Sequence, residues 1–369
     1  MASTPVWPAL VAAVFVLFSL ASAQVCDLNP NYYYIDRPEQ LEELSRNCTT
    51  LHGWLYTQDN FTGSFALPRV TNITGALTLN GRVTPGLTNI ELPDLEFAYD
   101  LRLYGVQNVS LPRLSEVELG LEISSRSDGI YNFPSLISAD RISLSGNLSS
   151  VSFEALRNAS TISIENRASD YYYHRNLTST VVDISFPVLE RVGDTHLRGN
   201  ISSFSAPELT TIAPAGNYGS AMLWVEPYEP GVSLDLPKLA FVNGSVQVDG
   251  VINAVSLPLL RNITGDFTLI TLSAEPIALD LPIEYTNEVE LRGNIDSVAL
   301  PNLRNYSTIR FFPWASFDCE GLGQQLNGTV SPPVVEYENF FCSGAETFSS
   351  KPRIVLGIVM VASLLNIIM

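Results

Sequence analysis

The sequence predicts an all-β protein folded as a right-handed β-solenoid. The first observation is a phrase of about fifteen residues that recurs, with the pattern apolar-x-apolar-x-Gly-Asn-apolar-x-x-apolar-x-apolar-Pro-x-Leu. The second is its period, because the prolines of successive copies stand mostly about twenty residues apart. A repeat of this length is typical of a solenoid, in which a coil buries its apolar face only by stacking on its neighbours. Clear copies occupy residues 101–114, 142–156, 195–209, 246–260 and 289–303.

Each part of the phrase predicts a local structure. Apolar residues at positions i and i+2 indicate a short strand with one buried face. The Gly-Asn pair suits a turn that needs a positive φ. The apolar-Pro-x-Leu segment returns two side chains to the core, and its proline tolerates the lack of a partner strand. The phrase resembles a leucine-rich repeat without its helical half, so we expect strands and turns. An all-β sandwich is the alternative, because its strands also recur at short intervals.

The N-terminal residues predict export. The apolar run 9–20 followed by Ala21-Ser22-Ala23 is typical of a signal peptide with a small-x-small cleavage site. An uncleaved signal anchor is the alternative, and the shortness of the run argues against it.

The C-terminal residues predict a lipid anchor. The apolar tail 354–369 follows the polar spacer 346–353 and the small residues Ser343, Gly344 and Ala345. This order is typical of a glycosylphosphatidylinositol (GPI) signal, with Ser343 or Gly344 as the attachment residue. The tail is shorter than the roughly 20 residues of a spanning helix. The expected organisation is a signal peptide (1–23), an N-terminal cap (24–53), solenoid repeats (54–316), a C-terminal cap with the anchor site (317–345) and a removed anchor signal (346–369).

Four cysteines lie near the two ends of the predicted solenoid. In an exported chain an even number of cysteines indicates disulfides. A solenoid keeps its ends apart, so the pairs Cys26–Cys48 and Cys319–Cys342 are favoured over crossed pairs. Each bond would close a loop worth on the order of 3 kcal/mol and would seal an open end of the stack. A zinc site is disfavoured by the cysteine spacing.

Twelve Asn-x-Ser/Thr sequons predict N-glycosylation. Asn147 and Asn200 occupy the Gly-Asn turn, whereas four other sequons follow the Pro-x-Leu segment at a second phase. Equal phase in a stack means equal azimuth, so we expect two glycan stripes, both in turns and none on the strand faces. The alternative is a buried asparagine ladder, which excludes a glycan at the same site. The sequons are Asn47, Asn60, Asn72, Asn108, Asn147, Asn158, Asn176, Asn200, Asn243, Asn262, Asn305 and Asn327.

The side chains between the paired apolar positions should form an open face of the sheet. Two of them, His196 and Trp224, are neighbours in this row and form the candidate ligand face. Two insertions, at 168–183 and 214–231, interrupt the period and are either recognition loops or covers for the sheet edge. The expected outward row is Thr78, Arg102, Glu122, Ser143, Ser163, His196, Trp224, Gln247, Thr268, Glu290 and Arg310.

The sequence offers little for catalysis or for cofactors. It has three histidines and no HExxH, G-x-S-x-G or phosphate-binding loop. Glu116, Glu118 and Glu122 are the densest carboxylates, and polysaccharide hydrolases use carboxylate pairs, but the alternation also fits a solvated strand edge. We therefore expect a non-enzymatic protein without cofactor or metal. The net charge of −18 disfavours nucleic acids and anionic membrane surfaces as partners.

Both caps resemble those of a known family. Residues 40–53 resemble the entry cap of receptor L-domain proteins. The segment Phe317-Asp318-Cys319 and residues 337–344 resemble the exit cap of fungal GPI-anchored cell-wall organisation proteins. The resemblance spans residues 24–345 and implies a leucine-rich-repeat-like β-solenoid at the plasma membrane or wall, with no catalytic residues. The family's long Ser/Thr-rich stalk is missing after Cys342, which favours retention near the plasma membrane.

The resulting expectation is a non-enzymatic, GPI-anchored surface glycoprotein needed for fungal cell-wall organisation. Its expected partners are wall polysaccharides or wall mannoproteins, and it would contact the membrane only through its lipid. A receptor-like module that binds a wall polysaccharide or a peptide is the first alternative. A polysaccharide-modifying enzyme is the second.

Overall fold

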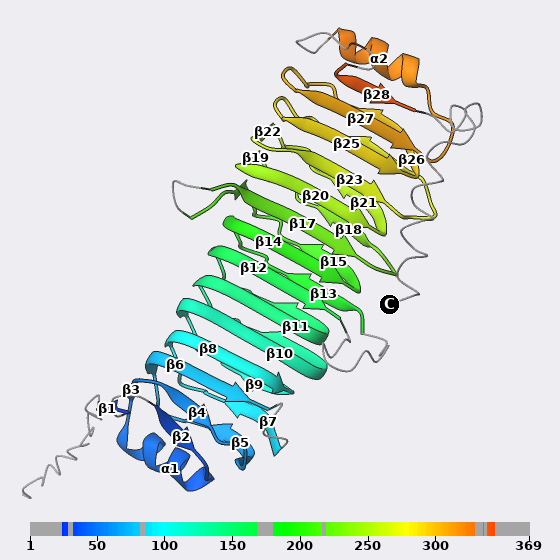
Figure 1. Cartoon of the computed structure of the whole chain (residues 1–369). Coiled ribbons are helices and arrows are strands. Elements are labelled where there is room, and N and C mark those ends of the chain that lie inside the picture. The colour runs from blue at the N-terminus through cyan, green and yellow to red at the C-terminus, as the bar shows by residue number, and fades with distance from the viewer. Residues whose placement is uncertain are drawn as a thin grey trace, which may run out of the picture.

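The computed structural model describes residues 24–28, 32–81, 86–167, 180–215, 219–328, 335 and 338–343. These residues form an elongated β-solenoid of about 13 turns with one helix at each end (Figure 1). The predicted signal peptide and anchor signal lie outside the described residues, as do Asn176 and Gly344.

Each coil contributes strands to as many as three sides of the solenoid, and all pairs between coils are parallel. The main sheet carries the longest strands. It consists of β2 (Tyr33–Ile35), β4 (Leu55–Thr57), β6 (Asn72–Asn80), β8 (Phe97–Val106), β10 (Glu116–Asn132), β11 (Ser138–Ser152), β12 (Asn158–Asn166), β14 (Arg191–Gly199), β17 (Ala221–Pro227), β20 (Gly244–Gly250), β23 (Phe267–Thr271), β25 (Glu288–Gly293), β27 (Thr308–Pro313) and β28 (Phe340–Cys342).

The other two sides are built from shorter strands. The second side is formed by the ends of β10 and β11 with β5 (Thr62–Ala66), β7 (Gly86–Glu91), β9 (Asn108–Ser110), β13 (Val182–Ser185), β15 (Ile201–Ser205), β18 (Val232–Asp235), β21 (Ile252–Ser256), β24 (Ile277–Asp280) and β26 (Ile295–Ala299). The third side is formed by the first residues of β6, β8, β10, β11, β12 and β14 with β1 (Val25–Asp27), β3 (Thr50–His52), β16 (Thr211–Ile212), β19 (Phe241–Val242) and β22 (Asn262–Ile263).

The predicted register of the coils is confirmed. Ile142, Val246 and Val289 belong to one continuous ladder of the main sheet, linked through β12, β14, β17 and β23. All three side chains are buried. The sandwich alternative is therefore wrong: parallel coils share one core along the whole stack. The stretch 214–231 is not simply a loop, since β17 lies within it and joins the main sheet.

The apolar-Pro-x-Leu segments send two side chains into the core, as predicted, but they are β-turns rather than edge strands. In the copy that starts at Phe186, the Leu189 amide donates to the Phe186 carbonyl three residues earlier. Proline suits position i+1 of such a turn because its φ is already fixed. The first residues of successive turns stack: the rings of Phe133 and Phe153 lie 4.9 Å apart, and those of Phe153 and Phe186 lie 5.2 Å apart.

Two separate constraints, a positive φ and a close approach of backbones, require glycine in the Gly-Asn turn. Gly199 and Gly293 have φ of 112° and 111°, a region that L side chains rarely adopt. A Cβ at Gly293 would also lie 2.0 Å from the carbonyl oxygen of Thr271 in the preceding coil. The corner therefore lets neighbouring backbones approach more closely than any side chain would permit.

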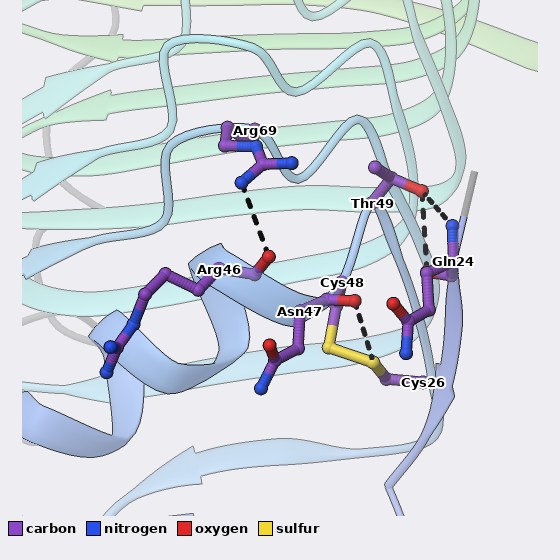
Figure 2. The surroundings of a disulfide bond; sticks show 7 residues. All are labelled: Gln24, Cys26, Arg46, Asn47, Cys48, Thr49 and Arg69. Carbon is purple, nitrogen blue, oxygen red and sulfur yellow. Dashed lines mark hydrogen bonds between the residues drawn. A yellow bond between two sulfur atoms is a disulfide. The ribbon is translucent and has the colours of Figure 1, made fainter. Parts of the chain in front are cut away.

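Both ends of the stack are closed by a helix and a disulfide. The helix α1 (Pro38–Asn47) buries Leu41 and Leu44, and α2 (Cys319–Asn327) buries Leu322 and Leu326. The predicted disulfides are confirmed. Cys26–Cys48 joins β1 to the end of α1 (Figure 2), and Cys319–Cys342 joins α2 to β28. The sequence analysis had not predicted the helices, although the cap boundaries it proposed include them.

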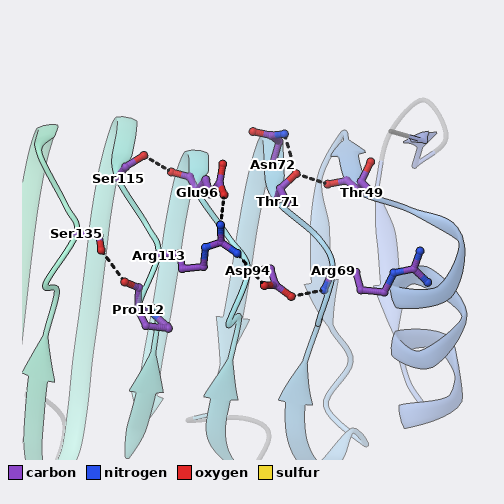
Figure 3. Close-up of polar contacts among 10 residues, drawn as sticks. All are labelled: Thr49, Arg69, Thr71, Asn72, Asp94, Glu96, Pro112, Arg113, Ser115 and Ser135. Atoms are coloured by element: carbon purple, nitrogen blue, oxygen red, sulfur yellow. Dashed lines mark hydrogen bonds and ion pairs between the residues drawn. The ribbon is translucent and has the colours of Figure 1, made fainter. Parts of the chain in front are cut away.

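Polar side chains add contacts between coils at the Pro-x-Leu turns of the N-terminal half (Figure 3). Arg113 bridges two acidic residues of the preceding coil, at 3.3 Å from Asp94 and 2.9 Å from Glu96. Asp94 in turn accepts from the Arg69 amide of the coil before it, at 2.9 Å. These charges are largely exposed, so each pair contributes little to stability. Their effect is to hold the turns in register.

We expect Gly293→Ala to destabilise the protein more than Gly63→Ala. Both glycines have positive φ, 111° and 104°, so both variants carry a conformational cost on the order of 1–3 kcal/mol. A Cβ at Gly63 meets nothing within 4 Å, whereas one at Gly293 meets the Thr271 carbonyl. Thermal unfolding midpoints measure the difference. Equal losses would show that the close approach of the coils does not contribute.

Candidate functional site

The outward face of the main sheet is the open face that the sequence predicts. All eleven predicted outward positions are paired in the predicted order, from Thr78 to Arg310. The row extends beyond the predicted one, to Tyr34 and Tyr56 at the N-terminal end and to Phe341 at the C-terminal end.

An aromatic cluster occupies the N-terminal end of this face. Its members are Tyr32, Tyr34, Trp54 and Tyr56. Tyr34 and Tyr56 are paired residues of β2 and β4, while Tyr32 and Trp54 precede them by two residues on the same face. The Tyr32 ring lies 5.4 Å from Trp54 and 5.5 Å from Tyr56, and the Tyr34 and Tyr56 rings lie 5.7 Å apart.

These rings remain open to solvent although they touch one another. Tyr32, Trp54 and Tyr34 are 51%, 49% and 48% exposed. Burial, and then the neighbouring Tyr32, raise the pKa of Tyr56, so this phenol is uncharged at neutral pH. The cluster is not predicted from the sequence, because the predicted outward row begins at Thr78. The alternation Tyr32-x-Tyr34 and Trp54-x-Tyr56 was the available signal.

A polar pocket of about 540 Å³ adjoins the cluster at Tyr34. It lies between the start of α1 and the turn after β4. One wall holds Asp36 and Arg37, which form an exposed ion pair at 3.4 Å. The side-chain oxygen of Gln40 accepts hydrogen bonds from the backbone amides of Asp36 and Arg37, which fixes that wall. The lining residues are Tyr34, Asp36, Arg37, Gln40, Gln58, Asp59 and Asn60.

A charged group follows on the next coils, where Asp100 pairs with Arg102 at 2.8 Å. Burial raises the pKa of the Asp100 carboxyl, and Arg102 opposes that shift. Tyr104 donates to Glu122 at 2.8 Å. Burial and this carboxylate raise the pKa of Tyr104 to about 12. The Asp100 carboxylate is buried, whereas Arg102 is half-exposed on the outward face and is separated from Tyr56 by the strand that carries Thr78.

The three glutamates that were considered as a catalytic alternative, Glu116, Glu118 and Glu122, do not form one carboxylate cluster. Glu116 pairs with Phe97 and Ser138 at the start of its strand, on the third side, whereas Glu122 lies on the main sheet. A register irregularity after Val117 separates the two positions. Among the described residues no group of three or more His, Cys, Asp or Glu is arranged to hold a metal ion.

His196 and Trp224 are neighbours, as predicted. Their rings stack in parallel, with centroids 4.2 Å apart and planes 9° apart. His196 Nε2 and Trp224 Nε1 are both shielded from solvent. One face of each ring is thus covered by the other ring. The His196–Trp224 pair therefore exposes less ring surface than the aromatic cluster. Its role as a ligand face stays a prediction.

No sequon asparagine is buried in the described part of the chain. Asn47, Asn60, Asn108, Asn158, Asn305 and Asn327 are exposed, and Asn72, Asn147, Asn200, Asn243 and Asn262 are half-buried. The fully buried Asn166 belongs to no sequon, and its amide donates to the carbonyls of Thr180 and Asn200. Where the structure describes them, the sequon asparagines therefore do not form a buried ladder.

The four sequons that follow the Pro-x-Leu segments lie on one side of the solenoid, as their equal position in the repeat predicts. Asn72, Asn158 and Asn262 lie in the ladder of the third side, and bridges through Tyr285 connect Asn262 to Asn305. The expectation that they lie in turns is wrong, because Asn72, Asn158 and Asn262 begin strands and Asn305 forms an isolated β-bridge. Their side chains still point away from the core. None of the described sequon asparagines lies on the outward face of the main sheet.

The predicted anchor region is only partly described. Ser343 follows the disulfide-bonded Cys342, and its amide donates to the Phe311 carbonyl at 3.1 Å. Among the described helices none is long and apolar enough to cross a membrane. No family model, curated protein or solved structure matches the chain.

We expect Asp100→Asn to change stability in a pH-dependent way. The pKa of Asp100 is raised in the folded state above its ordinary value of 3.8. Its protonation therefore contributes stability that is fully present below the unfolded pKa and is lost as pH rises through the folded pKa. The stability of the wild type relative to Asp100→Asn should increase as pH falls from 7 towards 4.

Asp183→Asn is the control with the opposite sign. Hydrogen bonds from Ser202 and Ser203 lower the pKa of Asp183, so its contribution is lost as pH falls. Denaturant unfolding of the wild type and both variants at each pH measures the difference. The same sign for both variants would contradict the assigned causes.

Proposed function

We propose that the protein is a GPI-anchored surface glycoprotein that organises the fungal cell wall without catalysing a reaction. Its partners are wall polysaccharides or wall mannoproteins. Three resemblances belong to the same proposal. Residues 40–53 resemble the entry cap of receptor L-domain proteins, the C-terminal cap resembles that of fungal GPI-anchored cell-wall organisation proteins, and the repeats resemble leucine-rich repeats. A location at the outer face of the plasma membrane belongs to it as well.

The observation that carries the proposal is the arrangement of the sequons around the solenoid. Those described are accessible, and several are aligned on the third side, whereas the outward face of the main sheet carries none. Glycans at these positions would coat one flank and leave the sheet open for a partner. Disulfides at both ends support an oxidising, extracellular environment.

A receptor-like module that binds a polysaccharide or a peptide is the second candidate. The aromatic cluster on the open face favours it, because exposed apolar groups of this size mark interaction sites. Purified chain incubated with β-glucan, chitin and mannan distinguishes both candidates from an enzyme, since only an enzyme produces new reducing ends or transfer products.

We expect loss of the protein to sensitise a fungal host to a wall-perturbing dye. The full chain should restore resistance, and phospholipase C should release it from intact cells. A chain lacking residues 346–369 should be secreted and should fail to restore resistance, because it lacks the anchor signal. Normal resistance after deletion would contradict a role in wall organisation, and cell association without residues 346–369 would contradict the anchor.

We expect glycans at Asn158, Asn262 and Asn305 in protein isolated from such cells. The three asparagines lie on one flank with accessible side chains, so a transferred glycan meets no neighbouring coil. Mass spectrometry of glycopeptides measures the occupancy of each sequon. If all three sites proved bare, the stripe on the third side would be wrong.

A further inference from the structure

The aromatic cluster places four large rings on the surface of the protein, in contact with one another. Tyr32, Tyr34, Trp54 and Tyr56 form a two-by-two array on β2 and β4, with each ring in contact with at least one other. Burial of such rings contributes strongly to stability, yet three of the four are about half exposed. The rings hold one another in place, so a ligand would meet a preorganised surface.

We propose that the aromatic cluster and the adjoining polar pocket form a binding site for a neutral polysaccharide. This proposal deepens the proposed function, because it assigns a site to the expected wall partner. Sugar rings carry apolar C–H faces that pack on aromatic faces, and their hydroxyls need hydrogen-bonding partners at the rim. The cluster supplies the first and the pocket supplies the second.

The geometry of the sheet fits a chain of sugars. Adjacent strands lie about 4.8 Å apart, close to the length of one hexose unit. A polysaccharide lying across the strands would pass from Tyr34 to Tyr56 and then over the small side chain of Thr78, since these three residues are paired in register. It would then reach Arg102, which is paired with Thr78 and lies beside Asp100.

The charges around the cluster disfavour an acidic ligand. Asp36 and Asp59 line the polar pocket together with Arg37, which is paired with Asp36, and the chain carries a net charge of −18. A phosphate, a nucleic acid or an acidic polysaccharide would be repelled by this surface. Carboxylates accept hydrogen bonds from hydroxyl groups, so the same residues suit uncharged sugars.

Glycans of the protein itself leave the cluster open on the sheet side. None of the described sequon asparagines lies on the outward face, but Asn60 lies at the rim of the pocket and is exposed. A glycan on Asn60 would reach the pocket before it reached the rings. Thr62→Ala removes the sequon Asn60-Phe61-Thr62 and keeps the Asn60 side chain, so this variant separates binding by the site from contacts of an attached glycan.

The test measures binding of the purified ectodomain to linear β-glucan, chitin and mannan oligosaccharides by calorimetry. We expect at least one of them to bind, and we expect Trp54→Ala and Tyr34→Ala each to weaken that binding by about tenfold or more. Trp314→Ala is the matched control, because Trp314 is 57% exposed and follows β27 at the other end of the stack. It should leave the affinity unchanged, as should Thr62→Ala, because Thr62 is exposed and does not line the pocket.

Several results would overturn the proposal. They are binding to none of the three oligosaccharides, undiminished binding by the Trp54→Ala Tyr34→Ala double variant, and binding that disappears in Thr62→Ala. Sedimentation that shows a dimer dissolved by Trp54→Ala, without sugar binding, would assign the cluster to self-association instead. Unchanged unfolding midpoints establish that the variants fold. A wall defect in the deletion strain without sugar binding would refute this site and leave the proposed function standing.

Discussion

The in-register hydrogen bonding of one coil on the next is the constraint on which the rest of the structure depends. Each coil's main-sheet strand pairs with the coils before and after it, so its apolar residues meet equivalent residues above and below. Close contact at the corners is possible because Gly199 and Gly293 place no side chain against the carbonyl of the preceding coil. A coil out of step by one residue would turn its core side chains to solvent.

Continuous stacking creates a problem at its two ends, where a coil has no neighbour. An unpaired strand edge invites association with other chains, and an open core exposes apolar side chains. The protein closes both ends by the same means, an amphipathic helix tied by a disulfide. At the N-terminus α1 lies over the first coil, and at the C-terminus α2 covers the last, with Phe311 and Phe317 packed edge to face at 4.4 Å.

The register also determines which side chains lie on each side of the solenoid. A residue's place in its coil decides whether it faces the core, the flank with the aligned sequons or the open sheet. The stack therefore separates a flank suited to glycans from a face suited to a partner. The aromatic cluster lies where that face meets the N-terminal cap, so the cap both closes the core and borders the polar pocket.

The sequence by itself determined the period, the inward ladder, the outward row from Thr78 to Arg310 and the local disulfide pairs. The first three follow from repetition, because any residue of a repeat has equivalents that must share its environment. The disulfide pairs follow from the distance at which a solenoid keeps its two ends. The tertiary structure decided what does not repeat. The helices occur once each, in caps outside the repeat pattern. The separation of Glu116 from Glu122 depends on an irregularity within one strand. The aromatic cluster arises because two short cap strands join the main sheet, and only their pairing extends the row to Tyr34 and Tyr56.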